Sequence, residues 1–509
     1  MINLRAVYTR AEEHTKLAVG GLFAVLVLLV VLQSVFSPTL VLSGVIVFGV
    51  IVLTIARPHI ALGLLAVYLP FESIVLKFTP DEVYIFVRYF AESLIYLVAL
   101  VTISRLLSGK LKHKVTTVDL PFLLFVITLV ASVLINLVAP TTALLGIRQI
   151  LRFMIVFFLV VDLAPSRQFI KQLTIVMFGI VLLQSVIGIL QSVIGEPLDV
   201  LLLPSDARTL GDITLTSGVQ QFWDPGSRVF ATLGRYDRLG NFLYFFLLMG
   251  VGLLFTKRYV TDRRLLWLFA LGLPTLILTY SRASWFAFLL GFLFIGVMIK
   301  RDKRVLAGLA IFVILVTGFV GASNLNVSQI TEGPGQTLSE RFYESFSYAR
   351  WRGEYYGLGR VFWFIHTPVD VVAASPIFGF GPGQFGGGVA AAMHNTEVYE
   401  NLGLPFGVFG TEGFIDNNWF SLWGETGTLG MVFYIWMLLG IFFMSLKTAR
   451  EAKDPFTRAM ALGLCAAIIG VSFNAFTSTV LEIRSIAFYL WLYAGFVYVL
   501  AREDVAKLV

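Results

Sequence analysis

The sequence predicts an all-α fold, a polytopic membrane bundle of 12 to 14 transmembrane helices with a large extracytoplasmic helical loop domain. Hydrophobic residues make up 58% of the 509 residues, and charged residues only 14%. The mean hydropathy is +0.85. These values lie far outside those of a soluble domain, so the chain is expected to fold in a lipid bilayer.

Apolar segments of spanning length recur along most of the chain. A spanning helix needs about 20 mostly apolar residues, and fourteen candidate segments approach this length. The first is expected to stay in the mature protein, because no small-residue cleavage site follows it before the next span. In chain order the predicted spans are 17–35, 39–56, 60–76, 83–104, 118–138, 144–163, 172–195, 241–256, 265–280, 283–299, 305–322, 428–446, 457–475 and 485–501.

The basic residues predict an orientation. If the N-terminus is cytoplasmic, 24 of the 38 lysines and arginines fall in cytoplasmic loops, as the positive-inside rule requires. The regular alternation favours twelve or fourteen spans over thirteen, so both termini are expected in the cytoplasm. The net charge of +7 follows from this bias and indicates no nucleic-acid partner.

This topology divides the chain into five parts. Two of them are long outer segments that are expected to carry the function. The parts are the transmembrane helices 1–195, an outer loop with arginines at 196–240, the transmembrane helices 241–322, a large outer loop domain at 323–427 and the transmembrane helices 428–509.

Basic residues outside the cytoplasmic loops are almost all arginines: Lys77 is joined there by thirteen arginines. Lysine would serve equally well for topology alone. Arginine has a planar fork that matches phosphate oxygens two at a time and stays protonated. The outer face is therefore expected to bind a phosphate-like anion.

Arg148 and Arg152 stand four residues apart, on one helix face near the outer end of the predicted span 144–163. Two like charges so placed repel, and charges at membrane depth are costly, so a partner anion in a cavity is expected. The alternative is that both side chains extend to headgroups of the outer leaflet.

Four further arginines lie at predicted outer turns. Arg282 lies between two spans, where it is either functional or an ordinary interfacial arginine. The run "GSRVFATLGRYDRLGNF" places Arg228, Arg235 and Arg238 just before a span. The alternative for this run is a solvated loop with Asp224 and Asp237 as counter-ions.

Other chemistries find little support in the sequence. The outer histidines His366 and His394 have no nearby cysteine and no metal-ligand spacing, so neither a metal nor a cofactor is expected. The only cysteine, Cys465, lies in an apolar run and cannot form an intramolecular disulfide. "GFGPGQFGGG" lacks the Lys-Ser/Thr of a P-loop and is instead a tight turn over a cavity.

Four stretches in order resemble the O-antigen ligase and O-antigen polymerase family, over about residues 228–430. They are "RVFATLGRYDRLGNFL", "SRASWFAFLLG", "SPIFGFGPGQF" with Arg360 upstream, and "DNNWFSLWGETGTLG". Members of this family are membrane glycosyltransferases that act on polyprenyl-diphosphate-linked glycans at the outer face of the bacterial cytoplasmic membrane. The resemblance implies a GT-C-type bundle, inversion at the transferred sugar, and functional positions at Arg228, Arg282, Asn417 and Glu425.

The chain departs from the family pattern at Asp416, where ligases carry the histidine thought to activate the acceptor hydroxyl. The departure is more like the polymerase branch, so a polysaccharide polymerase is slightly favoured over a ligase that joins the glycan to a lipid A-core-type acceptor. Ala231 and the run Arg235-Tyr236-Asp237 also differ from the family pattern. A folded loop could still bring His394 into the histidine position.

Breaking a sugar–diphosphate bond requires neutralisation of the departing charge and removal of a proton from the acceptor. Arginines can replace a metal in the first task, and a carboxylate can serve the second. The predicted diphosphate ligands are Arg148, Arg152, Arg228 and Arg282, with Arg360 as a further candidate. Asp416 is the predicted base, and Asn417, Trp419 and Glu425 are predicted to bind substrate, Trp419 by stacking on a sugar ring.

Each role has an alternative. Asp416 and Glu425 could instead cap a helix or interact with its dipole. The whole protein could instead be a flippase or transporter of anionic glycolipids, which also needs buried arginines at membrane depth. A structural protein that binds lipid headgroups is the third possibility.

Overall fold

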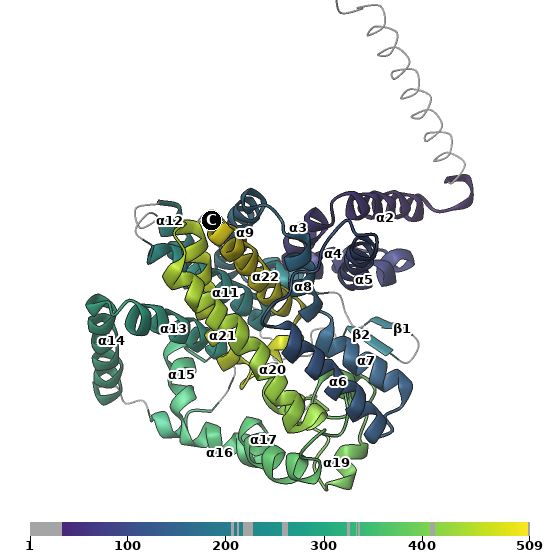
Figure 1. Ribbon diagram of the computed structural model, residues 1–509. Helices are drawn as coiled ribbons and strands as arrows, with labels where there is room; N and C mark the ends of the chain where they lie inside the picture. The colour runs from purple at the N-terminus through teal and green to yellow at the C-terminus, as the bar shows by residue number, and fades with distance from the viewer. Residues whose placement is uncertain are drawn as a thin grey trace, which may run out of the picture.

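The computed structural model describes residues 33–204, 208–210, 213–216, 228–256, 263–322, 326–331, 333, 336–407 and 413–506. As predicted, it is an all-helical bundle, and Figure 1 shows its elements. A two-stranded antiparallel hairpin, β1 (Arg208–Leu210) with β2 (Ile213–Thr216), is the one sheet in the described part.

The helices of the first half precede the large outer segment. They are α2 (Pro38–Ala56), α3 (Pro58–Tyr68), η1 (Leu69–Phe71), α4 (Glu72–Lys77), α5 (Asp81–Leu107), α6 (Asp119–Ile135), α7 (Pro140–Leu151), α8 (Met154–Leu163), α9 (Arg167–Ile194), α10 (Glu196–Leu202), η2 (Ala231–Leu233), α11 (Tyr236–Leu254), α12 (Arg263–Leu278), α13 (Arg282–Leu293), η3 (Phe294–Ile299) and α14 (Lys303–Ala322).

Short helices fill the outer segment, and three long ones complete the chain. They are η4 (Val327–Gln329), α15 (Leu338–Tyr343), η5 (Glu344–Phe346), α16 (Tyr348–Tyr356), α17 (Arg360–His366), η6 (Thr367–Val372), α18 (Gly388–Ala392), α19 (Glu397–Asn401), α20 (Asn418–Glu451), α21 (Pro455–Asn474), η7 (Val480–Glu482) and α22 (Arg484–Ala506).

Nine helices within the described residues are long and apolar enough to cross a membrane, and the bent pair α7 and α8 would make a tenth. The protein is therefore a multi-pass membrane protein, with fewer clear spans in this part than the predicted 12 to 14. The segment predicted at 118–138 forms α6, whose 17 residues reach only about 25 Å. Helices α12 and α14 occupy the segments predicted at 265–280 and 305–322, and the segment predicted at 17–35 lies almost wholly outside the described residues.

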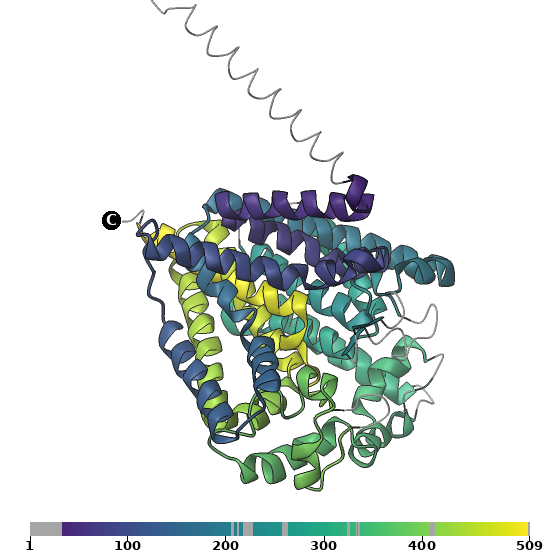
Figure 2. The same ribbon diagram turned by 90° about the vertical axis from the view of Figure 1, so that its right-hand side faces the viewer.

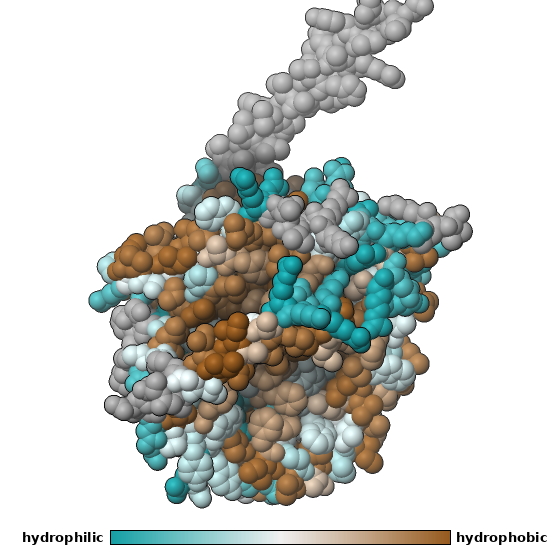
Figure 3. Space-filling model, turned by 90° about the vertical axis from the view of Figure 1, so that its left-hand side faces the viewer, coloured by the Kyte–Doolittle hydropathy of each residue, from teal (hydrophilic) through white to brown (hydrophobic). Residues whose placement is uncertain are grey.

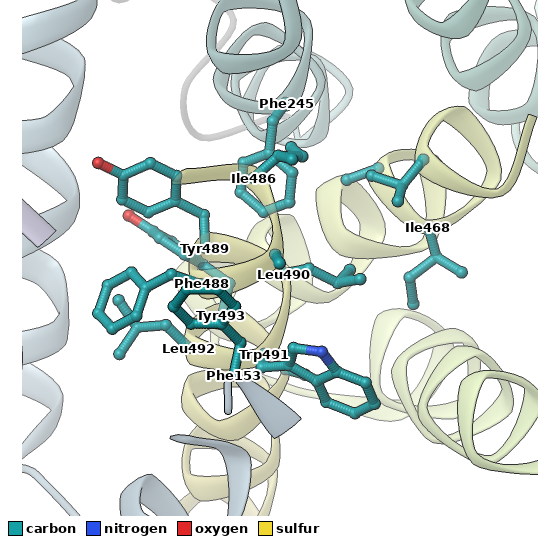
Figure 4. Packing of buried hydrophobic residues seen from close by; sticks show 14 of the residues in the cluster. Phe153, Phe245, Ile468, Ile486, Phe488, Tyr489, Leu490, Trp491, Leu492 and Tyr493 are labelled. Atoms are coloured by element: carbon teal, nitrogen blue, oxygen red, sulfur yellow. The ribbon is translucent and has the colours of Figure 1, made fainter. Parts of the chain in front are cut away.

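The centre of the bundle is formed by α11, α21 and α22. Within their most apolar stretches, 83%, 78% and 83% of residues are buried, against 6% for α2. Figure 4 shows consecutive residues of α22, from Phe488 to Tyr493, packed against neighbours on several sides. A helix that is apolar all round belongs inside a bundle, and this one anchors the segment that precedes it.

Helices α16, α17 and α19 gather at one end of the bundle, and the C-terminal end of α22 lies toward the other (Figures 1 and 2). The start of α20 reaches the same end as these short helices. Its N-cap is Asn417, whose Oδ1 accepts from the N–H of Phe420 at 3.1 Å. The polar residues just before α20 are thereby fixed against the outer helices.

The glycine-rich turn is fastened to a kink in α20. Phe380 and Gly381 donate their N–H groups to the carbonyls of Gly424 and Glu425, both at 2.9 Å. Gly427 has φ of 64° inside the helix, and a Cβ there would come within 2.5 Å of the nitrogen of Gly379. Only glycine fits such a conformation and approach without strain. The turn therefore lies over the first turns of α20.

Candidate active site: an arginine and carboxylate cluster

Glu344 is the buried centre of a group of arginines. Its carboxylate is fully buried and lies 2.9 Å from Arg282, 3.0 Å from Arg341 and 3.3 Å from Arg350. These arginines come from α13, α15 and α16, so one carboxylate connects the start of a spanning helix to two short helices. A single negative charge cannot neutralise three guanidinium groups, so the group keeps an excess of positive charge.

Arg360 connects this group to Asp416. Its guanidinium donates to the carbonyl of Thr477 at 2.9 Å and to Oδ2 of Asp416 at 3.2 Å. It also lies 3.5 Å from Glu354, which pairs with Arg350 at 2.9 Å. The arginines at 282, 341, 350 and 360, with Glu344, Glu354 and Asp416, are called the arginine cluster below. Four positive groups face three negative ones in it.

Exposure separates Asp416 from the other carboxylates of the cluster. The Asp416 side chain is 55% exposed, whereas those of Glu344 and Glu354 are 0% and 10% exposed. The two glutamates are enclosed counter-ions. Asp416 can be reached by a substrate while one of its oxygens is held by Arg360.

Arg235 is a second arginine whose charge interacts with that of Asp416. It precedes α11 and pairs with Asp237 at 2.8 Å. The pKa of Arg235 is raised above its ordinary value, chiefly by the charge of Asp237 and also by that of Asp416. Asp416 therefore lies in the field of two arginines, one from the outer helices and one from the start of α11.

Arg228 is held over an aromatic ring. Its guanidinium lies 4.4 Å from the ring centre of Tyr236. The next residue, Val229, donates its N–H to the carbonyl of Leu278, at the end of α12. This contact brings the segment of Arg228 against the turn that leads into Arg282.

Arg148 and Arg152 belong to a second group, built on Glu92 of α5. Glu92 is 3% exposed and lies 3.3 Å from Arg148, 2.7 Å from Arg152 and 3.4 Å from Arg484. The carboxylate of Glu92 is therefore a partner anion of the kind that the spacing of Arg148 and Arg152 predicts. Arg282 pairs with Glu344 and not with Glu92, so the ion pairs place these arginines in two separate groups.

The connector between α21 and α22 links the two groups. The carbonyl of Thr477 accepts from Arg360, and the carbonyl of Glu482 accepts from Arg152 at 2.9 Å. Arg484 then pairs with Glu92. One short segment, between two of the most buried helices, thus holds an arginine of each group in place.

Asn417 and Glu425 accept hydrogen bonds from the backbone of the helix and the loop near Asp416. Asn417 is fully buried and caps α20, and its Nδ2 has no hydrogen-bond partner among the described residues. Glu425 is buried, and its Oε1 accepts from the N–H of Gly383 at 2.9 Å. Both positions therefore support the loop and the helix next to Asp416.

The Trp419 ring is buried, whereas its predicted role requires an exposed ring face. Its side chain is 5% exposed, its Nε1 donates to the carbonyl of Ser472 at 2.9 Å, and its ring contacts Tyr434 and Phe476 at 6.0 Å. A ring enclosed in this way presents no open face for a sugar. The prediction that Trp419 stacks on substrate is corrected to a packing role, because the helix turns its indole toward α21.

Beneath Glu425 lies a small cavity of about 30 Å³, also lined by Gln149 and Glu482. Oε2 of Glu482 accepts from the N–H of Gly388 at 3.0 Å. Burial raises the pKa of Glu482 to about 7, although the Gly388 N–H and the charge of Arg152 act in the opposite direction. Two carboxyl groups therefore hold the two ends of the glycine-rich turn.

Several residues of the site were not singled out from the sequence, namely Arg341, Glu344, Arg350, Glu354, Glu482 and Arg484. A usable signal was present for some of them. Arg341 and Glu344 are three residues apart and Arg350 and Glu354 four, the spacings of ion pairs on a helix. Glu92 stands four residues after Arg88, a spacing that indicates an intramembrane pair, and in the structure it pairs with Arg148, Arg152 and Arg484. Glu482 carries no such signal, because its partners are distant in the sequence.

Comparison with known proteins bears on the same region. A family model described as O-antigen ligase matches residues 266–435. The matched segment begins in α12 and ends in α20, and it contains the whole arginine cluster with Asp416. Arg148, Arg152 and Arg228 lie before it. No curated protein matches the chain.

Proposed function

We propose, from the match of residues 266–435 to the O-antigen ligase family model, that this protein is a membrane glycosyltransferase. It transfers a polyprenyl-diphosphate-linked glycan to a sugar hydroxyl, without a metal and with inversion at the transferred sugar. The family match supports the general activity, and the residues that follow are our assignment.

The relation of Asp416 to Arg360 carries the proposal. A transferase of this kind needs a carboxylate that substrate can reach, beside cations that can hold a leaving diphosphate. Asp416 is the exposed carboxylate of the cluster and lies 3.2 Å from Arg360. We assign Asp416 as the base and Arg282 and Arg360 as ligands of the diphosphate.

The charge balance of the cluster suits a phosphate ligand. Four arginines face three carboxylates, and Glu344 and Glu354 are too enclosed to leave. A bound diphosphate would place its negative charge among these arginines, and guanidinium forks would match its oxygens. Arg228, stacked on Tyr236 beside the turn before Arg282, is a further ligand of the same diphosphate.

The reaction is a single displacement. The acceptor hydroxyl gives its proton to the Asp416 carboxylate as its oxygen bonds to the anomeric carbon. The bond from that carbon to the diphosphate oxygen breaks, and its electron pair leaves with the diphosphate, where the arginines stabilise it. Direct attack from the opposite face inverts the anomeric centre.

Arg148 and Arg152 take a different place in this scheme from the one their spacing suggests. Their charges are shared with Arg484 around Glu92, and Arg148 is the more exposed of the pair. We propose that Arg148 reaches substrate at the edge of the site, while Arg152 holds the connector that carries Thr477. Asn417 and Glu425 support the acceptor side from beneath.

We propose that the protein lies in the cytoplasmic membrane with both termini in the cytoplasm and the arginine cluster on the outer face. The five predicted parts of the chain fit this placement. The segment 323–427 contributes Glu344, Glu354, Arg360 and Asp416 to the site, and 196–240 contributes Arg228 and Arg235. The two outer segments would then enclose one site.

A polymerase is slightly favoured over a ligase, because Asp416 stands where ligases carry a histidine. A reconstituted assay with polyprenyl-diphosphate-linked repeat units and chelated metal tests this, with products separated by size. Longer lipid-linked chains support a polymerase, and transfer only to a separate lipid A-core-type acceptor would establish a ligase.

The same assay tests the enzyme class. The native protein is compared with Asp416→Asn and Arg282→Lys, and with Glu400→Gln as the matched control on an exposed outer helix. Loss in the first two variants and retention in the control support the proposed site. Movement of the lipid between leaflets without sugar transfer would instead identify a transporter and refute the enzyme.

A further inference from the structure

A second site lies away from the arginine cluster, in a groove of about 680 Å³ between α11, α12 and α13. Of the ten described residues that line it, nine are apolar and the tenth is Arg263. A mostly apolar wall with one charged group at its edge is typical of a site for an amphipathic ligand.

The groove opens to the surface of the bundle. Leu266 is 68% exposed on its rim, and Leu265 is buried at 7%. Figure 3 shows that the face of the molecule that carries α12 to α14 is largely hydrophobic and hollowed. Because α13 with η3 forms a candidate membrane span, we expect this opening to face lipid.

The charged end of the groove is the end opposite to the arginine cluster. Arg263 is the first residue of α12, whereas Arg282 begins α13, the next helix in the chain. The 16 residues of α12 separate the two by about 24 Å along its axis. A lipid with its headgroup at Arg263 is therefore a different molecule from a donor with its diphosphate at Arg282.

Basic residues are dense at this end. Arg264 follows Arg263, and Lys300, Arg301, Lys303 and Arg304 lie where η3 ends and α14 begins. In the proposed topology this end faces the cytoplasm. Basic pockets between spanning helices on that side bind anionic lipid headgroups.

We infer that the groove binds an anionic phospholipid of the cytoplasmic leaflet. Its phosphate lies at Arg263, and an acyl chain follows the wall formed by Leu266, Phe269 and Leu273 on α12 and Phe288 and Phe292 on α13. The leaflet rests on the proposed topology, while the site itself is independent of the transfer reaction.

Native mass spectrometry of the purified full-length protein tests the inference. The delipidated protein is titrated with phosphatidylglycerol and with phosphatidylcholine of identical acyl chains. One arginine at the headgroup predicts about fivefold tighter binding of phosphatidylglycerol. Arg263→Gln should reduce this preference to less than twofold, and Lys110→Gln, at an exposed lysine after α5 and away from the groove, should leave it intact.

A groove-filling variant tests the proposed position of the acyl chain. Leu266→Trp changes an exposed residue, so the fold is expected to persist, and it should weaken binding of both lipids. Equal binding of the two lipids by the native protein, a preference retained in Arg263→Gln, or undiminished binding in Leu266→Trp would each overturn the inference. Tighter binding of a polyprenyl phosphate than of phosphatidylglycerol would also overturn it.

Discussion

Arg360 holds one carboxylate oxygen of Asp416 at 3.2 Å, while more than half of the Asp416 side chain stays exposed. Arg360 is itself fixed by the carbonyl of Thr477 and by Glu354. The position of Asp416 is thus set by the connector between α21 and α22 and by the outer helices together.

Replacing Asp416 by asparagine should abolish most of the transfer. The amide keeps the shape of the side chain but cannot accept the proton of the acceptor hydroxyl, a loss of about 100- to 10,000-fold in kcat. Initial rates of chain extension measure this. The melting temperature should change little, because the side chain is largely exposed. A variant that kept its rate would exclude Asp416 as the base.

Replacing Arg360 by lysine should lower kcat/KM by roughly 10- to 100-fold. The charge remains, but one ammonium group cannot contact Thr477, Asp416 and Glu354 at once in the geometry of the guanidinium fork. Saturation kinetics with the lipid-linked donor measure the change. If Arg360→Lys and Arg360→Ala were equally impaired, geometry would be the requirement, whereas full activity in Arg360→Lys would show that charge alone suffices.

Replacing Glu344 by glutamine should destabilise the protein. The change leaves Arg282, Arg341 and Arg350 together without their shared buried anion, and breaking such a pair costs on the order of 3 kcal/mol. Thermal unfolding followed by tryptophan fluorescence should show a lower melting temperature. Glu340→Gln is the matched control, because glutamine preserves the capping box at that exposed position. Equal melting temperatures for both variants would contradict this account of Glu344.

The fold could be predicted where the sequence of one segment alone determines that it forms a helix. Runs such as that of α22 are apolar over spanning length, and each predicted apolar segment that the structure describes is helical. The described part shows fewer clear spans than the 12 to 14 predicted for the chain, and α6 is one reason, because it is apolar yet has only 17 residues. Hydropathy reports burial from water and does not measure where a helix ends.

The site could be predicted only in part. Arg360 pairs with Asp416, and Arg282 pairs with Glu344 in the same cluster; residue types and family motifs singled out these two arginines and Asp416 from the sequence. The partner of Arg148 and Arg152 is Glu92, which lies about sixty residues earlier in a different helix. Such pairs depend on how helices pack, and one sequence carries no record of that. Trp419 was misjudged for the same reason, because an aromatic residue beside a site can turn inward.

Replacing Trp419 by phenylalanine should leave the KM for glycan substrates unchanged within about twofold. Phenylalanine keeps a ring against Tyr434 and Phe476 and loses the hydrogen bond to Ser472. The expected cost is about 1 kcal/mol of stability, visible as a lower melting temperature. A rise in KM without loss of stability would restore the sugar-stacking role.

Replacing Glu482 by glutamine should remove one source of pH dependence in stability. The folded protein holds this proton up to a pH of about 7, and the unfolded chain releases it near 4.5. Between these values the folded state binds more protons, so the native protein loses stability as pH rises from about 4.5 to 7, by on the order of 3 kcal/mol. The glutamine variant still accepts from Gly388 and should show a flatter melting profile across that window. Identical pH profiles for the two proteins would mean that Glu482 is ionised throughout and that Arg152 outweighs its burial.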